Sequence, residues 1–205
     1  LNPWDKSLDQ IRAVAQLNCI SSVSDYCQYF EERIGKQRHF GEVSPSYSHL
    51  PAEAYQCMSR LTEDVRFLFV MRDPTRRAAS HMRHLRLMIN KDKSLPELLE
   101  RVGPSHTIYI KSDYRYPLRT LRSLGLADRC RFMIYEDLFK QDSLDSLCDW
   151  LGLARHKANV EKALNVGMGE HLTPQQLEEL RERLAPIYEG LRHDPVTKAA
   201  SRWWW

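Results

Sequence analysis

The strongest constraint on the fold is the apolar run Phe67–Met71, which stops abruptly at the charged residues Arg72 and Asp73. A continuous apolar run of this length is typical of a strand covered on both faces in a parallel sheet, although a short buried helix has a similar composition. The residues that follow favour the strand, because Asp73 suits a helix N-cap and Pro74 suits the first helical position. We therefore predict a buried strand that leads directly into a helix.

A second apolar run, Arg131–Tyr135, predicts another strand further along the chain, and apolar residues at helical spacing lie between and around the two runs. Strands separated by helices predict the α/β class, here a three-layer α/β/α domain with a parallel sheet. A length of 205 residues is suited to one such domain. The expected elements are helices at Ser7–Leu17, Ser22–Ile34 and Ala52–Leu61, an extended segment at Arg38–Val43, a strand at Val65–Met71, helices at Asp73–Asn90 and Ser112–Leu124, a strand at Arg131–Tyr135, and helices at Asp142–Leu151, Lys157–Leu164 and Thr173–Arg192.

The composition excludes several other classes of protein. A net charge of +3 is too small for a polybasic nucleic-acid-binding arm. No apolar stretch approaches the roughly 20 residues that a membrane-spanning helix needs. The five cysteines are dispersed, odd in number and without CxxC spacing, which argues against a disulfide framework and a zinc ribbon. We expect a protein of a reducing compartment, the cytoplasm, unless an anchor ahead of Leu1 directs it to the Golgi lumen.

The charged corner after the first strand suits an oxyanion. Ligands of parallel α/β sheets bind beyond the carboxyl ends of the strands, where Arg72 lies. The helix that follows presents free backbone N–H groups and the positive end of its dipole. The planar guanidinium of Arg72 matches phosphate or sulfate oxygens, and Ser80, eight residues on, offers a hydroxyl to the same anion. The alternative is that Asp73 and Pro74 only begin a helix whose arginines are solvated.

The order of several motifs resembles the PAPS-dependent sulfotransferases, in particular the heparan-sulfate-type and bacterial branch. A strand followed by Arg72-Asp73-Pro74 and then by Arg77 and Ser80 is similar to their 3′-phosphate-binding segment. The other segments that carry the resemblance are Tyr26–Phe30 (Y-x-x-x-F), Gly41–Tyr47 (GEVSPSY, for G-E-x-S-P-x-Y), Ser112–Leu118 (S-x-Y-x-x-x-L) and Phe132–Leu138 (FMIYEDL, a strand that ends in Y-E-D-L).

This resemblance implies a P-loop NTPase-like fold and transfer of a sulfuryl group from 3′-phosphoadenosine-5′-phosphosulfate (PAPS) to a hydroxyl or amine by in-line displacement, without a metal. Arg72 and Ser80 would hold the 3′-phosphate, and Tyr114 would line the nucleotide site. Adenosine 3′,5′-bisphosphate would be the nucleotide product. The acceptor could be a glycan, a lipid, a small molecule or a peptide, and no nucleic-acid partner is expected.

Part of the family pattern does not occur in this chain. The glycine-rich 5′-phosphosulfate loop with its lysine is missing, so the resemblance implies a single domain, residues 1–205, that is incomplete at its N-terminus. Two visible residues compete as the general base. Glu42 lies in GEVSPSY, and His49 lies in Ser48-His49-Leu50-Pro51, which is similar to the H-L-P of the cytosolic sulfotransferases. A carboxylate that precedes Leu1 is the third candidate.

Two other functions are compatible with a nucleotide-binding α/β domain. A P-loop kinase-like enzyme would use ATP and would need a Walker lysine and an acidic Mg²⁺ ligand, neither of which is identifiable in the sequence. A non-catalytic nucleotide-binding protein would need only the charged corner after the first strand, with Arg72 and Ser80. The interpretation we favour from the sequence is the sulfotransferase.

Overall fold

The structure is a computed structural model that describes residues 22–88, 92–160 and 170–205. It divides into two compact units, Leu1–Pro45 and Ser46–Trp205, and each is described by itself. The predicted helix at 7–17 lies outside the described residues, as do residues 161–164 of the predicted helix at 157–164. The segment 157–160 is described and is not helical.

The described part of the first unit is built on α2 (Val23–Ile34), which begins where the sequence predicts. Its N-terminus is held by a capping box, in which the Ser22 hydroxyl accepts from the Asp25 backbone and the Asp25 carboxylate accepts from the Ser22 backbone. Phe30 on this helix stacks on Phe40 of the following segment, with ring centroids 5.0 Å apart. Aromatic packing therefore fixes the extended segment that leads to Glu42.

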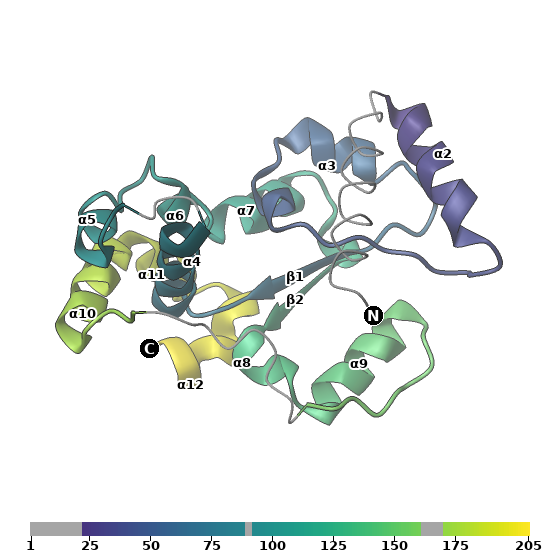
Figure 1. Cartoon of the computed structure of the whole chain (residues 1–205). Coiled ribbons are helices and arrows are strands. Elements are labelled where there is room, and N and C mark those ends of the chain that lie inside the picture. Colours follow the sequence, from purple (N-terminus) through teal and green to yellow (C-terminus); the bar gives the residue numbers. More distant parts are fainter. Residues whose placement is uncertain (1–21, 89–91, 161–169) are drawn as a thin grey trace, which may run out of the picture. The chain divides into compact units, whose positions relative to one another are not determined.

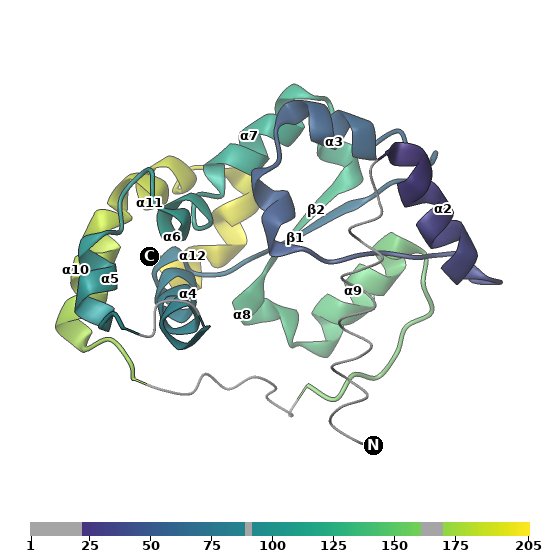
Figure 2. The same cartoon turned by 45° about the horizontal axis from the view of Figure 1, so that its top comes forward.

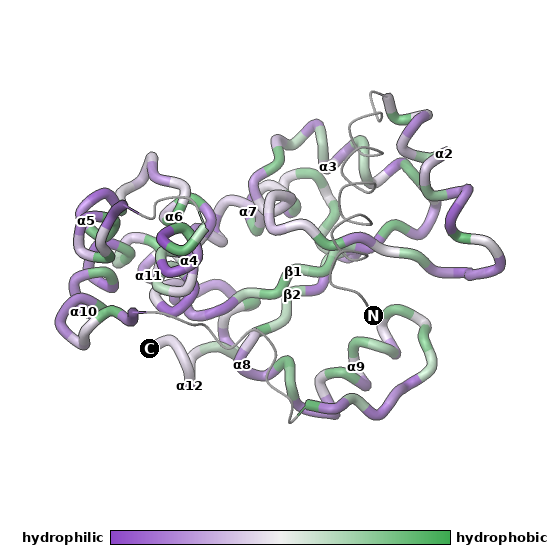
Figure 3. Tube along the Cα trace, in the orientation of Figure 1, coloured by the Kyte–Doolittle hydropathy of each residue, from purple (hydrophilic) through white to green (hydrophobic). Residues whose placement is uncertain are grey.

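The second unit contains two parallel strands, β1 (Phe67–Met71) and β2 (Cys130–Ile134), which pair directly (Figure 1). Phe67 is opposite Cys130, and Phe69 is opposite Phe132, on whose ring it stacks at 5.2 Å. The predicted parallel α/β arrangement is confirmed. Both strands are predominantly apolar, and the hydropathy of the chain shows them as two mainly hydrophobic segments side by side (Figure 3).

One face of the strand pair is covered by α3 (Ala52–Met58) and α7 (Arg115–Ser123). A small core forms there, which contains Tyr55 of α3, Leu121 of α7 and Phe67 of β1. The alternation of side chains along a strand places Leu68 and Val70 on the opposite face. These two residues are 41% and 43% exposed, so this face of β1 is covered less completely.

The second face looks toward α8 (Tyr135–Leu138) and α9 (Gln141–Leu151), as two views of the chain agree (Figures 1 and 2). Arg131 of β2 joins α9 by hydrogen bonds to the carbonyl and hydroxyl oxygens of Ser146. Its guanidinium also lies 5.8 Å from the ring centroid of Trp150. This side of the sheet is therefore held by a cation and an indole as well as by apolar contacts.

The main hydrophobic core lies beyond the carboxyl ends of the strands, where a group of helices packs around α4 (Pro74–Met88). Met71 and Ile134, the last residues of the two strands, belong to this core, as do Met82 of α4 and Trp204 near the C-terminus. The other helices are α5 (Leu95–Glu100), α6 (Thr107–Ile110), α10 (Pro174–Arg183), α11 (Ala185–Leu191) and α12 (Ser201–Trp204), with 3₁₀ turns at Pro45–His49, Ala127–Arg129 and Pro195–Ala200.

Two kinds of functional element are not found in the described part of the chain. None of its helices is long and apolar enough to cross a membrane. Within the same residues, no group of three or more His, Cys, Asp or Glu side chains could hold a metal ion. Cys27, Cys57, Cys130 and Cys148, the described cysteines, are free thiols.

Candidate oxyanion site at the strand ends

Arg72 follows β1 directly and presents a cation that no described carboxylate neutralises. Its backbone N–H donates to the hydroxyl of Tyr114 at 3.2 Å. Its guanidinium carbon lies 4.8 Å from the ring centroid of Tyr135, which supports the side chain from one side. Within the described residues the guanidinium forms no ion pair, and its buried Nε has no hydrogen-bond partner. An unpaired guanidinium at the carboxyl end of a strand is suited to an anionic ligand.

Asp73 fixes the backbone of this corner. It is buried, and its Oδ1 accepts the Arg76 backbone N–H at 2.8 Å, which is the N-cap contact that the sequence predicts for α4. Its Oδ2 accepts from the Tyr188 hydroxyl at 2.7 Å, and its backbone N–H donates to Glu136 Oε1 at 3.1 Å. Burial is the main cause that raises the pKa of Tyr188, and the negative charge of Asp73 raises it further, so this hydroxyl keeps its proton. The Asp73 carboxylate therefore joins the end of β1 and the start of α4 to the C-terminal helix α11.

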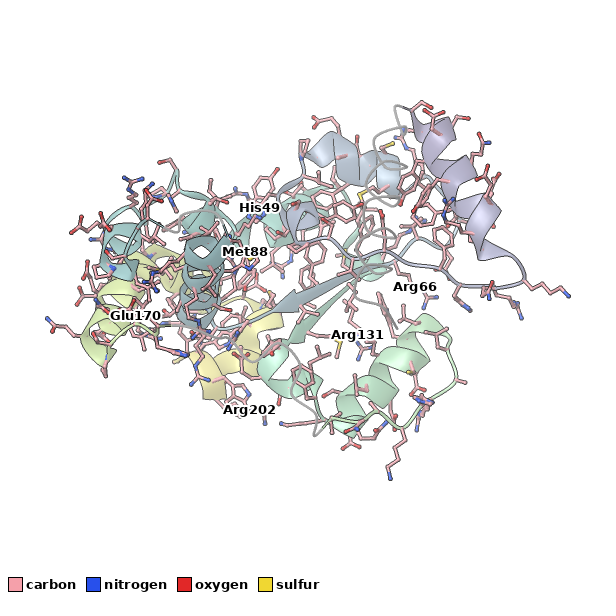
Figure 4. All side chains as sticks on the ribbon, viewed as in Figure 1. His49, Arg66, Met88, Arg131, Glu170 and Arg202 are labelled. Carbon is pink, nitrogen blue, oxygen red and sulfur yellow. The ribbon has the colours of Figure 1, made fainter. Side chains whose placement is uncertain are left out.

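Two carboxylates follow β2 and have different roles. Glu136 uses Oε1 to hold the Asp73 backbone, while its Oε2 is buried and has no partner in the described part of the chain. Asp137 accepts from Arg202 Nη2 at 2.5 Å and also from Lys140. The hydrogen bond from Arg202 is the main cause that lowers the pKa of Asp137 to about 2, and the hydrogen bond from Lys140 also lowers it. Figure 4 shows Arg202 on the C-terminal segment beside α8. Asp137 therefore has a structural role.

Tyr114, the predicted nucleotide ligand, is buried under the corner. Its hydroxyl accepts the Arg72 backbone N–H, and its ring is stacked on Trp204 with centroids 6.1 Å apart. Burial raises the pKa of Tyr114 to about 12, so the hydroxyl stays neutral. Trp204 is held in turn by Arg181, whose Nη2 donates to the Trp204 carbonyl at 2.7 Å. The structure thus brings Tyr114 and Arg72 together through the backbone of Arg72.

Ser80, the other predicted phosphate ligand, lies in the first half of α4 and is half-buried. In the part of the chain that the structure describes, its hydroxyl makes no hydrogen bond, either to Arg72 or to another residue. Ser112, at which the sequence predicts the start of a helix, does not cap one. It is fully buried, accepts from Arg77 Nη1 at 2.8 Å and donates to the Ile108 carbonyl at 2.8 Å. α7 begins only at Arg115.

The two candidate bases occupy different units. Glu42 belongs to the first unit, and its Oε1 accepts from the Tyr26 hydroxyl at 2.6 Å. His49 belongs to the second unit (Figure 4). Its Nε2 donates to the carbonyl of Ile110, and its Nδ1 lies 2.7 Å from the hydroxyl of Ser48. Burial lowers the pKa of His49, so the ring is neutral near pH 7. A neutral imidazole has the right protonation state for a base, but both of its nitrogens are engaged.

Several residues of the corner could not be found from the sequence. Glu136 lies in the Y-E-D-L segment that carries the family resemblance, but the sequence does not indicate its contact with the Asp73 backbone. Tyr188 and Trp204 gave no local signal, because their partners are far away in the sequence. Only the way in which the C-terminal helices pack brings them to Asp73 and Tyr114.

Comparisons with known proteins support the fold. No protein-family model matches the sequence, and no curated protein matches it. A crystal structure of a sulfotransferase from Alicyclobacillus acidocaldarius is similar, with a TM-score of 0.63. The match covers 86% of this chain and 72% of that chain, at 20% sequence identity. The likeness shows that this chain has the P-loop-like α/β fold of that structure.

Proposed function

We propose that the protein is a sulfotransferase that moves a sulfuryl group from PAPS to a hydroxyl or amine acceptor. The observation that carries the proposal is the unpaired Arg72 guanidinium at the carboxyl end of β1, in a fold shared with a sulfotransferase. The ordered motifs of the sequence, which resemble the heparan-sulfate-type and bacterial branch, add the donor nucleotide to this proposal.

Arg72 and Ser80 would bind the 3′-phosphate of the nucleotide. The guanidinium of Arg72 and the hydroxyl of Ser80 are both without a hydrogen-bonding partner in the described part of the chain, so a phosphate would not have to displace one. Each charge-assisted hydrogen bond would contribute about 1.5–3 kcal/mol. Tyr114, Asp73 and Glu136 would act on the nucleotide indirectly, because their hydrogen bonds set the backbone from which Arg72 projects.

Bound PAPS would supply the sulfuryl group, and the protein would supply position, charge and a place for one proton. An in-line displacement at sulfur gains most from holding the two reactants in alignment. The acceptor proton must leave as the new bond forms, and a general base would add about 10²–10⁴-fold to the rate. Within this chain Glu42 and His49 are the candidates. His49 would receive the proton on Nδ1, which requires the Ser48 hydroxyl to turn away.

The test is calorimetry with adenosine 3′,5′-bisphosphate. Replacing Arg72 with Ala should weaken binding at least about tenfold, because one charge-assisted contact is worth more than the 1.4 kcal/mol that a factor of ten requires. Arg72→Lys should bind with intermediate affinity, since it keeps the charge and loses the planar fork. Arg119→Ala, which removes an exposed arginine of α7, should bind like the unchanged protein.

Three outcomes would contradict the proposal. Equal affinity of the Arg72→Ala variant and the unchanged protein would remove Arg72 from the nucleotide site. Tighter binding of ATP than of adenosine 3′,5′-bisphosphate in the same experiment would favour a kinase-like enzyme. A protein that binds the bisphosphate but transfers no sulfuryl group to any tested acceptor would instead be a non-catalytic nucleotide-binding protein.

A further inference from the structure

A group of basic side chains lies between α4 and α6, away from the contacts described for Arg72. Arg77, His81 and His84 follow one face of α4, because residues four and seven positions apart lie on the same side of a helix. His106 and Lys111 flank α6, which packs against α4. We call these five residues the α4–α6 cluster.

Arg77 anchors this cluster. Its Nη1 donates to the Ile108 carbonyl at 2.9 Å and to the Ser112 hydroxyl at 2.8 Å. Its Nη2 donates to His81 Nδ1 at 2.9 Å. All three partners are neutral, so they orient the guanidinium without cancelling its charge. Arg77 therefore contributes a fixed positive charge to the surface between the two helices.

The hydrogen bonds also fix the tautomers of two histidines. His81 accepts from Arg77 on Nδ1, so the proton of its neutral ring must lie on Nε2. His106 accepts the Ile108 backbone N–H on Nδ1 at 3.3 Å, which gives the same tautomer. Both rings therefore present an Nε2–H donor. In the residues that the structure describes, these two donors and the ammonium of Lys111 have no acceptor.

The neighbouring groups that lower the pKa of His81 are all basic. They are Arg77 and His84 from α4, and Lys111 and His106 from the chain on either side of α6. Burial is the main cause that lowers the pKa of His81 to about 4, and these basic groups lower it further. Burial is also the main cause that lowers the pKa of His106, and the charge of Arg101 at the end of α5 lowers it further.

The carboxylate of Asp113 acts on the neighbouring His49 but is itself bonded to Arg115 at 2.7 Å. Among the residues that the structure describes, no carboxylate forms an ion pair with the α4–α6 cluster. Positive groups that repel one another without a counter-charge lose stability, and an anion bound among them would restore it.

We infer that the α4–α6 cluster is an oxyanion site, in which the Nε2–H groups of His81 and His106 and the ammonium of Lys111 bind a sulfate, phosphate or carboxylate group and protons are taken up on binding. This chemistry could come from two sources. One is the transferable or phosphate end of the donor, and the other is an anionic group on the acceptor. The role of the site in transfer rests on the proposed function, whereas its existence does not.

Proton uptake follows from the sign of the electrostatic effect. The added proton occupies Nδ1 of His81, so Arg77 Nη2 must turn away from this atom, while Arg77 Nη1 stays bonded to Ile108 and Ser112. A bound oxyanion stabilises the imidazolium form, so it raises the pKa of His81 from about 4 toward or above its ordinary value of 6.5. Affinity for the anion should then increase as the pH falls between the pKa of the bound form and that of the free form. A site made of arginines and lysines alone would show no such dependence.

The direct test follows the imidazole nitrogens of the full protein by ¹⁵N NMR during titration with inorganic sulfate. The resonances of His81 and His106 should shift with saturation, and the affinity should be higher at about pH 5.5 than at about pH 7.5. Lys111→Gln should weaken sulfate binding about tenfold, because it removes a charged donor. His193, exposed and outside the cluster, and the variant Lys157→Gln serve as controls and should show no effect.

Several results would overturn the inference. One is a titration in which His81 and His106 do not respond, and another is one in which all histidines respond alike, as they would to ionic strength. Unchanged sulfate affinity in the Lys111→Gln variant would also remove this residue from the site. If Lys111→Gln unfolds the protein, the shifts of His81 and His106 in the unchanged protein still decide the matter.

The source is identified by repeating the titration with nucleotides. If PAPS itself shifts His81 and His106 and prevents sulfate from binding, the site holds the donor. If sulfate still binds when PAPS or adenosine 3′,5′-bisphosphate is present at saturation, the site is left for an anionic acceptor. The Arg72→Ala variant separates the two proposals, since it should lose the bisphosphate and keep the sulfate response. Bisphosphate binding without any sulfate response would overturn this inference alone.

Discussion

Single residues at the strand ends show how burial selects which charges persist. Arg72 keeps a charge without an ion-pair partner in the described residues, whereas Asp73 is buried and shares its two oxygens between a helix cap and Tyr188. A buried carboxylate with good hydrogen bonds is costly to lose and difficult to replace. An exposed or half-exposed cation costs little and remains available to a ligand. The corner thus divides its charged groups into those that hold the backbone and one that is free to bind.

The same reasoning gives a dependence of stability on pH that is centred on His81. Its pKa is about 4 in the folded protein and 6.5 as the ordinary value, so the unfolded chain binds more protons between these limits. The free energy of unfolding should therefore be fully retained above about pH 6.5 and fall as the pH decreases toward about 4. Urea unfolding across this range, in sulfate-free buffer, measures the effect.

His81→Gln should flatten the dependence in this window, because glutamine does not titrate. The corresponding change at the exposed His193 should leave the slope unchanged. Asp137 does not change the slope in this window. Its pKa is about 2 in the folded protein and 3.8 as the ordinary value, so its contribution to stability varies with pH only below this window. A slope that is identical in the His81→Gln variant and the unchanged protein would show that His81 is not held neutral by the fold.

At the scale of elements, the junction of β1 and α4 carries most of the site, and its helix cap can be tested directly. Replacing Asp73 with Ala removes the acceptor of the Arg76 N–H and leaves the Tyr188 hydroxyl without its carboxylate partner. The lost cap alone should lower the free energy of unfolding by about 0.5–2 kcal/mol, and the buried hydroxyl should add to this loss. Urea unfolding measures the change.

Asp128→Ala is a suitable comparison, because Asp128 is exposed in a short 3₁₀ turn. It should alter stability by no more than about 0.5 kcal/mol. If the Asp73 and Asp128 variants were equally stable, the corner would not depend on this carboxylate.

The elements also show how far the sequence determines the fold. Both strands and the start of α4 were predictable, because apolar runs and the Asp-Pro pair are local signals. The predicted helix at 173–192 was wrong in one respect, since it divides into α10 and α11 around Leu184. Pro186 explains the division, because its ring clashes with the carbonyl four residues earlier and it has no N–H to donate.

The helices α5 and α6 differ in how far the sequence indicated them. The capping box formed by Ser94 and Glu97 begins α5, and this signal was present in the sequence although no helix was predicted there. α6 is only four residues long and is capped by His106, so no periodic pattern could have indicated it. The α4–α6 cluster was for this reason beyond reach of the sequence, since His106 and Lys111 come to α4 only through the packing of α6.

For the whole molecule, the C-terminal tryptophans link global stability to the candidate site. Trp204 is 1% exposed and belongs to the main core, while its neighbour Trp203 is 43% exposed. Trp204→Ala should lower the free energy of unfolding by about 3–5 kcal/mol, because it creates a large cavity. It should also weaken adenosine 3′,5′-bisphosphate binding, since Tyr114 loses the ring on which it is stacked.

Trp203→Ala is the matched control, and its effect on stability should stay below about 1 kcal/mol. Thermal unfolding and calorimetry of the two variants measure both quantities. A Trp203 variant as unstable as the Trp204 variant would show that the C-terminal segment is held by its exposed ring.

The parallel pairing of β1 with β2 also constrains the order in which the molecule can assemble. Phe67 and Cys130 become partners only after the whole intervening chain, from α4 to α7, has closed as a loop. Closing a long loop costs entropy before the contacts that it permits are gained, so such pairings form late. The helices, whose hydrogen bonds are local, can form first. The candidate oxyanion site, which joins the ends of both strands, is therefore among the last parts of the protein to acquire its shape.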